Sequence, residues 1–210
     1  MKSIYIIRHG QSLANTGAES MPDKTIPITD LGQSQAQSLC QYWQANLPAP
    51  SAIYHSQMLR TQQTAQPFHQ HYDIAPKERA LLNELSCLGF DTVKGLVGEQ
   101  RSKIAQQYWL SADIHHRDAK DADSFADFLN RVDDFMIAAP DLPNNSLCFG
   151  HGQWIGLLAW RLLGCKIENN CDMQKFRQFQ TAMPMYNTVM YRLNIAEDGV
   201  MQLTYRPRDC

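Results

Sequence analysis

The sequence predicts an α/β fold with a mostly parallel central sheet. Short apolar segments of strand length, at residues 3–7, 52–54 and 146–149, alternate with longer segments of helical periodicity, which is the pattern of βαβ units. The first and last of these apolar segments run directly into a histidine with a glycine beside it, His9 and His151. Ligands of open α/β sheets bind outside the carboxyl ends of the strands, so neighbouring strands would place both imidazoles in one crevice.

The bulk composition predicts one soluble domain over residues 1–210. A chain of 210 residues with 44% hydrophobic content can bury one sizeable core, and no change of composition divides it. The formal net charge of −2 includes no basic excess that would indicate a nucleic-acid partner. The apolar stretches at residues 3–7 and 154–163 are too short to cross a membrane, so no membrane partner is expected.

The cysteines indicate a reducing compartment. They are scattered without a C-x-x-C pair, and several lie in apolar or helical segments. We therefore expect reduced thiols and a cytoplasmic protein. The six cysteines are Cys40, Cys87, Cys148, Cys165, Cys171 and Cys210.

The first third of the chain predicts two helices on either side of a strand. Thr29 or Asp30 is expected to cap the first helix, which has apolar residues at helical spacing and ends before Pro48. After the strand, a second helix is expected to begin at Met58 and to stop near Pro67, because proline lacks the amide that a helix interior needs.

The sequence pattern of residues 82–140 is less regular and indicates a helical insertion. We expect this insertion to lie over the sheet and to shape the entrance of a pocket at the strand ends. Helices are expected at residues 98–109 and 123–138. Ser124 and Asp127 form a capping-box-like start for the second of these helices, whose apolar side chains recur every three or four positions.

The last part of the chain predicts an antiparallel hairpin at one edge of the sheet. Residues 185–193 and 200–205 have strand-like patterns, and Asp198 and Gly199 between them favour a tight turn. This hairpin would close the sheet.

A cationic phosphate site is predicted around His9. Arg8 places a fixed charge beside the imidazole, and Gly10 lets the backbone approach a ligand closely. Arg60, one helical turn after Ser56, is expected to supply a second guanidinium group. Arginine charges disfavour protonation of an imidazole and stabilise phosphoryl oxygens, so a neutral His9 could act as the nucleophile in phosphoryl transfer.

Other polar side chains in the sequence do not add to this site. The histidines at 69–71 and 115–116 have spacings found in metal sites, yet no cysteine or carboxylate cluster accompanies them, so neither a metal nor a cofactor is predicted. Arg131 is expected to pair with Asp127 or Asp134 on the surface of its own helix.

Several motifs follow one another in a fixed order over most of the chain. They are Arg8-His9-Gly10, Thr29-x2-Gly32-x2-Gln35-Ala36, Ser56-x3-Arg60-x3-Thr64-Ala65, Glu84, and Gly150-His151-Gly152. In this order they resemble the motifs of the histidine phosphatase (phosphoglycerate mutase-like) superfamily. The resemblance implies a three-layer α/β/α sandwich.

The resemblance also implies roles for individual residues. His9 would be phosphorylated, and Glu84 would act first as an acid and then as a base. Its apolar neighbours in the sequence would help to keep Glu84 protonated. The predicted catalytic residues are His9, Glu84 and His151. The predicted phosphate-binding residues are Arg8, Asn15, Arg60 and His151.

The expected activity is metal-independent hydrolysis of a small phosphorylated metabolite. Residues 15–28 lack the tryptophan-rich segment of the mutase branch, and no matching substrate-binding stretch follows Glu84, which favours hydrolysis over isomerisation. A phosphoglycerate-type mutase, a phosphoprotein phosphatase and a non-enzymatic phospho-ligand binding module remain open alternatives. The sequence predicts neither the particular substrate nor the oligomeric state.

Overall fold

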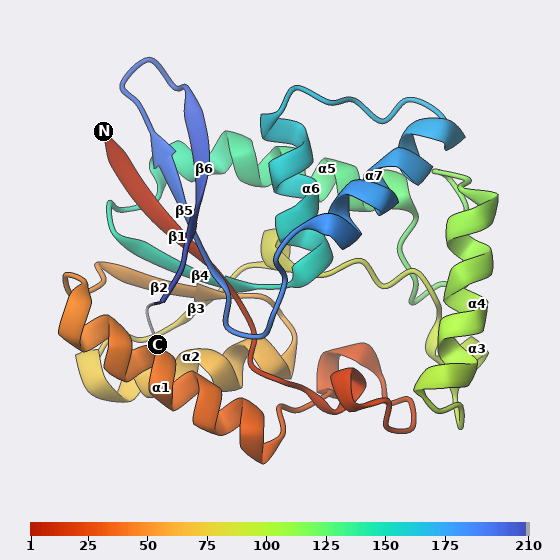
Figure 1. The fold of residues 1–210 in the computed structure, drawn as a ribbon, viewed down its shortest axis with the longest axis horizontal. Helices are drawn as coiled ribbons and strands as arrows, with labels where there is room; N and C mark the ends of the chain where they lie inside the picture. The colour runs from red at the N-terminus through yellow and green to blue at the C-terminus, as the bar shows by residue number, and fades with distance from the viewer. Residues whose placement is uncertain (209–210) are drawn as a thin grey trace.

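The computed structural model describes residues 1–208, within which six strands form a sheet in the order β3-β2-β4-β1-β5-β6 (Figure 1). Strand β4 pairs in parallel with β1 and β2, and β2 pairs in parallel with β3, whereas β1–β5 and β5–β6 are antiparallel pairs. The predicted mostly parallel sheet with an antiparallel edge hairpin is confirmed. The strands are Lys2–Arg8 (β1), Ala52–His55 (β2), Lys77–Glu78 (β3), Ser146–Gly150 (β4), Met190–Ile195 (β5) and Met201–Arg206 (β6).

Strand β1 is buried on both of its faces. Ile4 and Ile6 belong to one core cluster, and Tyr5 and Ile7 belong to the other. Successive side chains of a strand point to opposite faces of the sheet, so a continuous apolar run marks a strand that is covered on both sides.

Helices cover both faces and complete the predicted α/β/α sandwich. On one face α1 and α2 bury Trp43 and Phe68 completely, and on the other face α5 and α6 bury Phe128 and Trp154 (Figure 1). The helices are Asp30–Asn46 (α1), Leu59–Tyr72 (α2), Phe90–Val93 (α3), Gly98–Ser111 (α4), Phe125–Ala138 (α5), Gly152–Leu162 (α6) and Asn170–Ala182 (α7). Short 3-10 turns lie at Leu13–Thr16, Asp23–Thr25, Ala80–Leu82 and Ala139–Asp141.

Two predicted helix caps are present. The Thr29 hydroxyl accepts a hydrogen bond from the Gly32 amide at 3.1 Å at the start of α1. At the start of α5 the Ser124 hydroxyl accepts from the Asp127 amide at 3.2 Å, while the Asp127 carboxylate accepts from the Ser124 amide at 2.8 Å. These bonds satisfy amides that the first helical turn leaves without partners.

The prediction that the second helix stops near Pro67 is wrong, because α2 continues through this residue to Tyr72. An interior proline removes one helical hydrogen bond and costs about 3 kcal/mol. The next residue, Phe68, is completely buried beside Trp43, and burying such a side chain contributes about 1.5–3 kcal/mol. The helix ends only where Asp73 adopts a left-handed conformation with φ of 53°.

The C-terminal part of the chain differs from the prediction in two ways. Strand β5 begins at Met190 rather than at residue 185. The residues just before it form a turn, in which Thr188 has φ of 60°. Helix α7 was not expected, since most of its side chains are polar; it is anchored by the buried Met173 and Phe176.

The segment at residues 82–140 holds α3, α4 and α5. Helix α5 packs on α6 within a layer of the sandwich, whereas α4 lies at the far end of the molecule beside α7 (Figure 1). Whether this segment is an insertion remains a prediction. None of the helices within residues 1–208 is long and apolar enough to cross a membrane.

The cysteines of the described part of the chain form no disulfide. They are Cys40, Cys87, Cys148, Cys165 and Cys171. The remaining one, Cys210, lies outside the described residues.

Two glycines allow the loop after β1 to press against the first turn of α1. A Cβ added at Gly10 would lie 2.6 Å from the Gly32 carbonyl oxygen, and a Cβ added at Gly32 would collide with the Gln11 carbonyl oxygen. The Gln11 amide also donates to Gln35 Oε1 at 2.8 Å. The Thr29–Ala36 motif therefore holds the backbone that carries His9.

We expect Gly32→Ala to lower the free energy of unfolding by about 1–3 kcal/mol, because overpacking forces backbone to move. Urea unfolding followed by circular dichroism measures this change. Ser38→Ala, at an exposed position of the same helix, is the matched control and should leave stability nearly unchanged. Equal stability of the two variants would show that the loop and α1 are not in close contact.

Candidate active site

The two glycine-flanked histidines lie together at the carboxyl ends of adjacent strands. Arg8 of β1 pairs with Gly150 of β4, so His9 and His151 follow neighbouring positions in the sheet. The His9 amide donates to the Gly150 carbonyl at 3.1 Å, and the two imidazole centroids are 5.3 Å apart. The two imidazoles therefore lie side by side, as the positions of the two strands predict.

The His9 side chain has a defined tautomer. Its Nδ1 lies 2.7 Å from the Gly10 carbonyl oxygen, which can only accept, so Nδ1 carries the proton and Nε2 carries a lone pair. Burial, together with the charges of Arg60 and Arg8, holds the pKa of His9 well below its ordinary value of 6.5. A neutral imidazole with a free Nε2 is a nucleophile.

The loop that carries His9 is tied to α2. The Gly10 amide donates to the Thr64 hydroxyl at 3.0 Å, and this hydroxyl donates to the Arg60 carbonyl at 2.6 Å. The Thr64 side chain thus joins the motif that contains His9 to the motif that contains Arg60.

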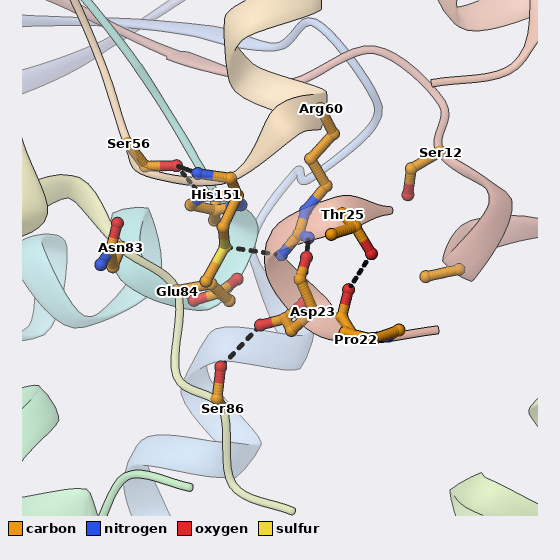
Figure 2. A network of polar contacts seen from close by, with 12 residues as sticks. Ser12, Pro22, Asp23, Thr25, Ser56, Arg60, Asn83, Glu84, Ser86 and His151 are labelled. Atoms are coloured by element: carbon orange, nitrogen blue, oxygen red, sulfur yellow. Dashed lines mark hydrogen bonds and ion pairs between the residues drawn. The ribbon is translucent and has the colours of Figure 1, made fainter. Parts of the chain in front are cut away.

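Two arginines supply fixed positive charge at the site. Arg8 donates to the Met185 carbonyl oxygen, and burial lowers its pKa from the ordinary value while the nearby Glu84 raises it. Arg60 is only 5% exposed, and its Nη2 lies 2.9 Å from the Met58 sulfur (Figure 2). Guanidinium groups remain charged in proteins, so both can hold a phosphoryl dianion.

Asp23 is a site residue that the sequence did not reveal. Its carboxylate accepts from Arg60 Nη1 at 2.9 Å and from the Ser86 hydroxyl at 2.6 Å (Figure 2). It lies in a short 3-10 turn with no motif around it, so no local signal could have identified it. Through these contacts Asp23 joins the loop before α1 to the segment that follows Glu84.

Glu84 lies at the N-terminus of α6. Its two carboxylate oxygens accept the Gln153 and Trp154 amides, each at 3.0 Å. Burial raises the pKa of Glu84 above 4.5, whereas the hydrogen bonds from backbone amides and the charge of Arg60 act in the opposite direction. This carboxyl can hold a proton and is also stabilised after losing it.

Asn15 is connected to His9 through a second asparagine. Its Oδ1 accepts from the Ser12 amide at 3.1 Å and from Asn187 Nδ2 at 3.2 Å, which leaves its own amide group to donate to a ligand. Asn187 Nδ2 also lies 3.1 Å from the His9 carbonyl oxygen. Sequence reasoning missed Asn187, because its partners are more than 170 positions away in the chain.

The prediction that Arg131 pairs on the surface of its own helix is wrong. It forms an ion pair with Asp123 at 2.8 Å and donates to the carbonyl oxygens of Asn83 and Glu84 at 3.3 and 3.1 Å. The Asp127 carboxylate is already bound by Ser124 and Arg117, and the segment that carries Glu84 brings its carbonyl oxygens within reach of the Arg131 guanidinium.

Two cavities open beside the site on either side of the contact between Asp23 and Ser86. One, of about 400 Å³, is lined by Glu84 and Arg131 among others, and the second, of about 490 Å³, by Asn15 among others. Residues from the 82–140 segment line both cavities. These volumes suit a small-molecule ligand.

A neutral imidazole flanked by arginines, with a carboxyl group nearby, defines an enzyme that handles phosphate esters. Residues 4–203 match the family described as the histidine phosphatase superfamily (branch 1). The chain therefore belongs to the histidine phosphatase superfamily, as its motifs predicted.

Solved structures share the fold. The α-ribazole phosphatase of Shigella flexneri superposes with a TM-score of 0.72 at 20% identity, covering 97% of this chain and 94% of its own. The phosphoserine phosphatase of Entamoeba histolytica, in complex with 3-phosphoglyceric acid, gives a TM-score of 0.70 at 20% identity, with coverage of 99% and 98%.

A curated relative matches only locally. The PE-PGRS family protein PE_PGRS11 of Mycobacterium tuberculosis is 39% identical over 85 residues, which are 39% of this chain and 14% of that protein. The match thus spans a small part of a much longer protein.

The lowered pKa of His9 makes stability depend on pH in a defined direction. The unfolded chain binds a proton at His9 below pH 6.5 that the folded chain does not bind, so this stabilising contribution is present above 6.5 and is lost as the pH falls. The His9→Asn variant lacks this imidazole. Below pH 6.5 its free energy of unfolding should therefore rise relative to that of the native protein, by up to about 1.4 kcal/mol for each pH unit. Urea unfolding of both proteins between about pH 7 and pH 5 measures the shift. Parallel pH dependences would show that folded His9 titrates normally.

Proposed function

We propose that the protein hydrolyses small phosphorylated metabolites through a phosphohistidine at His9, without a metal ion. The observation that carries the proposal is the hydrogen bond from His9 Nδ1 to the Gly10 carbonyl beside two arginines, since it leaves Nε2 with a lone pair that can attack phosphorus. The arginines provide the positive charge that phosphoryl transfer requires.

In the first half of the reaction, His9 Nε2 attacks phosphorus and the bond to the leaving oxygen breaks. The leaving alkoxide takes the proton of Glu84 and departs as an alcohol. Arg8, Arg60, Asn15 and His151 hold the phosphoryl oxygens during this transfer. The products are a phosphohistidine and the Glu84 carboxylate.

In the second half, water replaces the alcohol. The Glu84 carboxylate removes a proton from the water, whose oxygen attacks phosphorus while the bond to His9 Nε2 breaks. Inorganic phosphate leaves, and both side chains return to their starting protonation states. Glu84 suits both steps because burial favours its protonated form and the α6 amides stabilise its anion.

The proposed substrates are phosphomonoesters of small metabolites, and we place the enzyme in the cytoplasm. Cavities of about 400 and 490 Å³ beside the site accommodate leaving groups of this size. The structural neighbours named above include a phosphoserine phosphatase and an α-ribazole phosphatase, both with small phosphorylated substrates in their names. The cysteines within residues 1–208 form no disulfide, which suits a reducing compartment.

Phosphate release from p-nitrophenyl phosphate, sugar phosphates and phosphoglycerates should persist in EDTA and should disappear in His9→Ala. The reason is that the nucleophile is a side chain and the positive charge comes from arginines. Quenching in alkaline detergent should trap a labelled phosphoenzyme, base-stable and acid-labile, in the native protein only. Wild-type turnover by His9→Ala would overturn the proposal. Phosphoglycerate isomerised without phosphate release would establish a mutase, and binding without turnover would establish a binding module.

Glu84→Gln should separate substrates by their leaving groups. A general acid contributes about 10²–10⁴-fold, so kcat/KM for an alkyl phosphate from the panel should fall by this factor. For p-nitrophenyl phosphate, whose leaving group needs no proton, kcat/KM should change by less than about tenfold, while slow dephosphorylation produces a burst of p-nitrophenol. Glu99→Gln, an exposed glutamate of α4, is the matched control. Equal losses for both substrates would remove Glu84 from the acid role.

A further inference from the structure

Ser56, which follows β2, has no role in the reaction described above. Its side chain is completely buried, and its hydroxyl oxygen lies 2.8 Å from His151 Nε2 (Figure 2). The same oxygen lies 2.8 Å from Thr61 Oγ1 and accepts the Met58 amide at 3.2 Å. A buried hydroxyl with three such partners holds the imidazole in place.

The second ring nitrogen of His151, Nδ1, is buried and has no hydrogen-bond partner within residues 1–208. Because Nε2 is occupied by Ser56, Nδ1 is the nitrogen left for a phosphoryl group on the neighbouring His9. Burial and the charges of Arg60 and Arg8 hold the pKa of His151 well below 6.5, which favours the neutral ring. A neutral ring has one proton, and only the tautomer with this proton on Nδ1 can donate to a phosphoryl oxygen.

The hydroxyls around His151 allow two arrangements. In the first, Nε2 donates to Ser56, Ser56 donates to Thr61, and Thr61 donates to the Met58 carbonyl at 2.7 Å. Nδ1 is then a lone pair, which repels phosphate. In the second, Thr61 donates to Ser56 and Ser56 donates to Nε2, so the ring proton resides on Nδ1. The Met58 carbonyl still accepts the Thr61 amide at 3.0 Å, so the second arrangement strands no acceptor.

We propose that Ser56 is a positioning residue that donates to His151 Nε2 and thereby keeps the ring proton on Nδ1, where it bonds a phosphoryl oxygen. In this arrangement Thr61 donates to Ser56, so the Ser56 proton remains free for Nε2. The charge of the ring stays zero in both arrangements, so phosphate binding does not require an imidazolium. This inference rests on the proposed function, because it deepens the part that His151 plays in holding the phosphoryl group.

The tautomer of His151 can be observed directly. In ¹⁵N-labelled protein saturated with inorganic phosphate, long-range ¹H–¹⁵N spectra should show a neutral His151 with protonated Nδ1 and unprotonated Nε2, the signals being assigned by their loss in His151→Asn. Ser56→Ala should lose this preference. An Nε2-protonated ring or an imidazolium in the native phosphate complex would overturn the proposal.

Removing the hydroxyl of Ser56 and removing that of Thr61 should affect phosphate binding differently. Ser56→Ala leaves the Nε2 lone pair buried without a donor, and the dissociation constant of inorganic phosphate, measured by direct binding, should rise about tenfold. In Thr61→Val the Ser56 hydroxyl has lost its other acceptor and must donate to Nε2. The Nδ1-protonated ring should then be present even without phosphate, and phosphate should bind as tightly as to the native protein or more tightly.

Thr61→Ser keeps the hydroxyl and is the matched control, which should behave as the native protein. If Ser56→Ala does not fold, the Thr61→Val variant still tests the proposal. An Nε2-protonated His151 ring in that variant would overturn it. Neither readout requires turnover. A His9→Ala protein that still hydrolyses substrate would therefore refute the proposed function separately, whatever tautomer His151 shows.

Discussion

The hydrogen bond between His9 Nδ1 and the Gly10 carbonyl determines which ring nitrogen faces a ligand, and much of the surrounding structure holds this carbonyl in place. The Gly10 amide is bound by Thr64 of α2, and the Gly10 backbone presses against Gly32 of α1 at a distance that no side chain would allow. Strand β1 places the loop beside β4 and so beside His151. Two helices and two strands thus converge on one peptide unit.

Burial acts on the two proposed proton-handling groups in opposite directions. It disfavours the charged form of each, so it lowers the pKa of His9 and raises the pKa of Glu84. Burial thus favours the neutral form of the proposed nucleophile and the protonated form of the proposed acid for the same physical reason. Arg60 reinforces the effect on His9 and opposes it on Glu84, where the nearby Asp23 partly compensates. The α6 amides limit the rise in the pKa of Glu84. This limit suits a group that is proposed to act also as a base.

Much of the fold could be predicted because its signals are local. The apolar run of β1, the caps at Thr29 and Ser124, and the turn before β6 each lie within a few residues of the structure that they produce. The extent of α2 could not be predicted in this way, because the burial of Phe68 depends on other elements. Most side chains of helix α7 are polar, and the burial of its few anchoring residues, Met173 and Phe176, depends on the layer that they contact.

The sequence by itself determined the α/β class, the family, and the residues that the family motifs name, because these depend on the order and spacing of residue types. Only the tertiary structure decided how those residues are oriented. Asp23 meets Arg60, Arg131 meets the Glu84 carbonyl, and Ser56 meets a histidine 95 positions away. Tautomers and pKa shifts follow from such distant partners and from burial, neither of which a linear pattern contains.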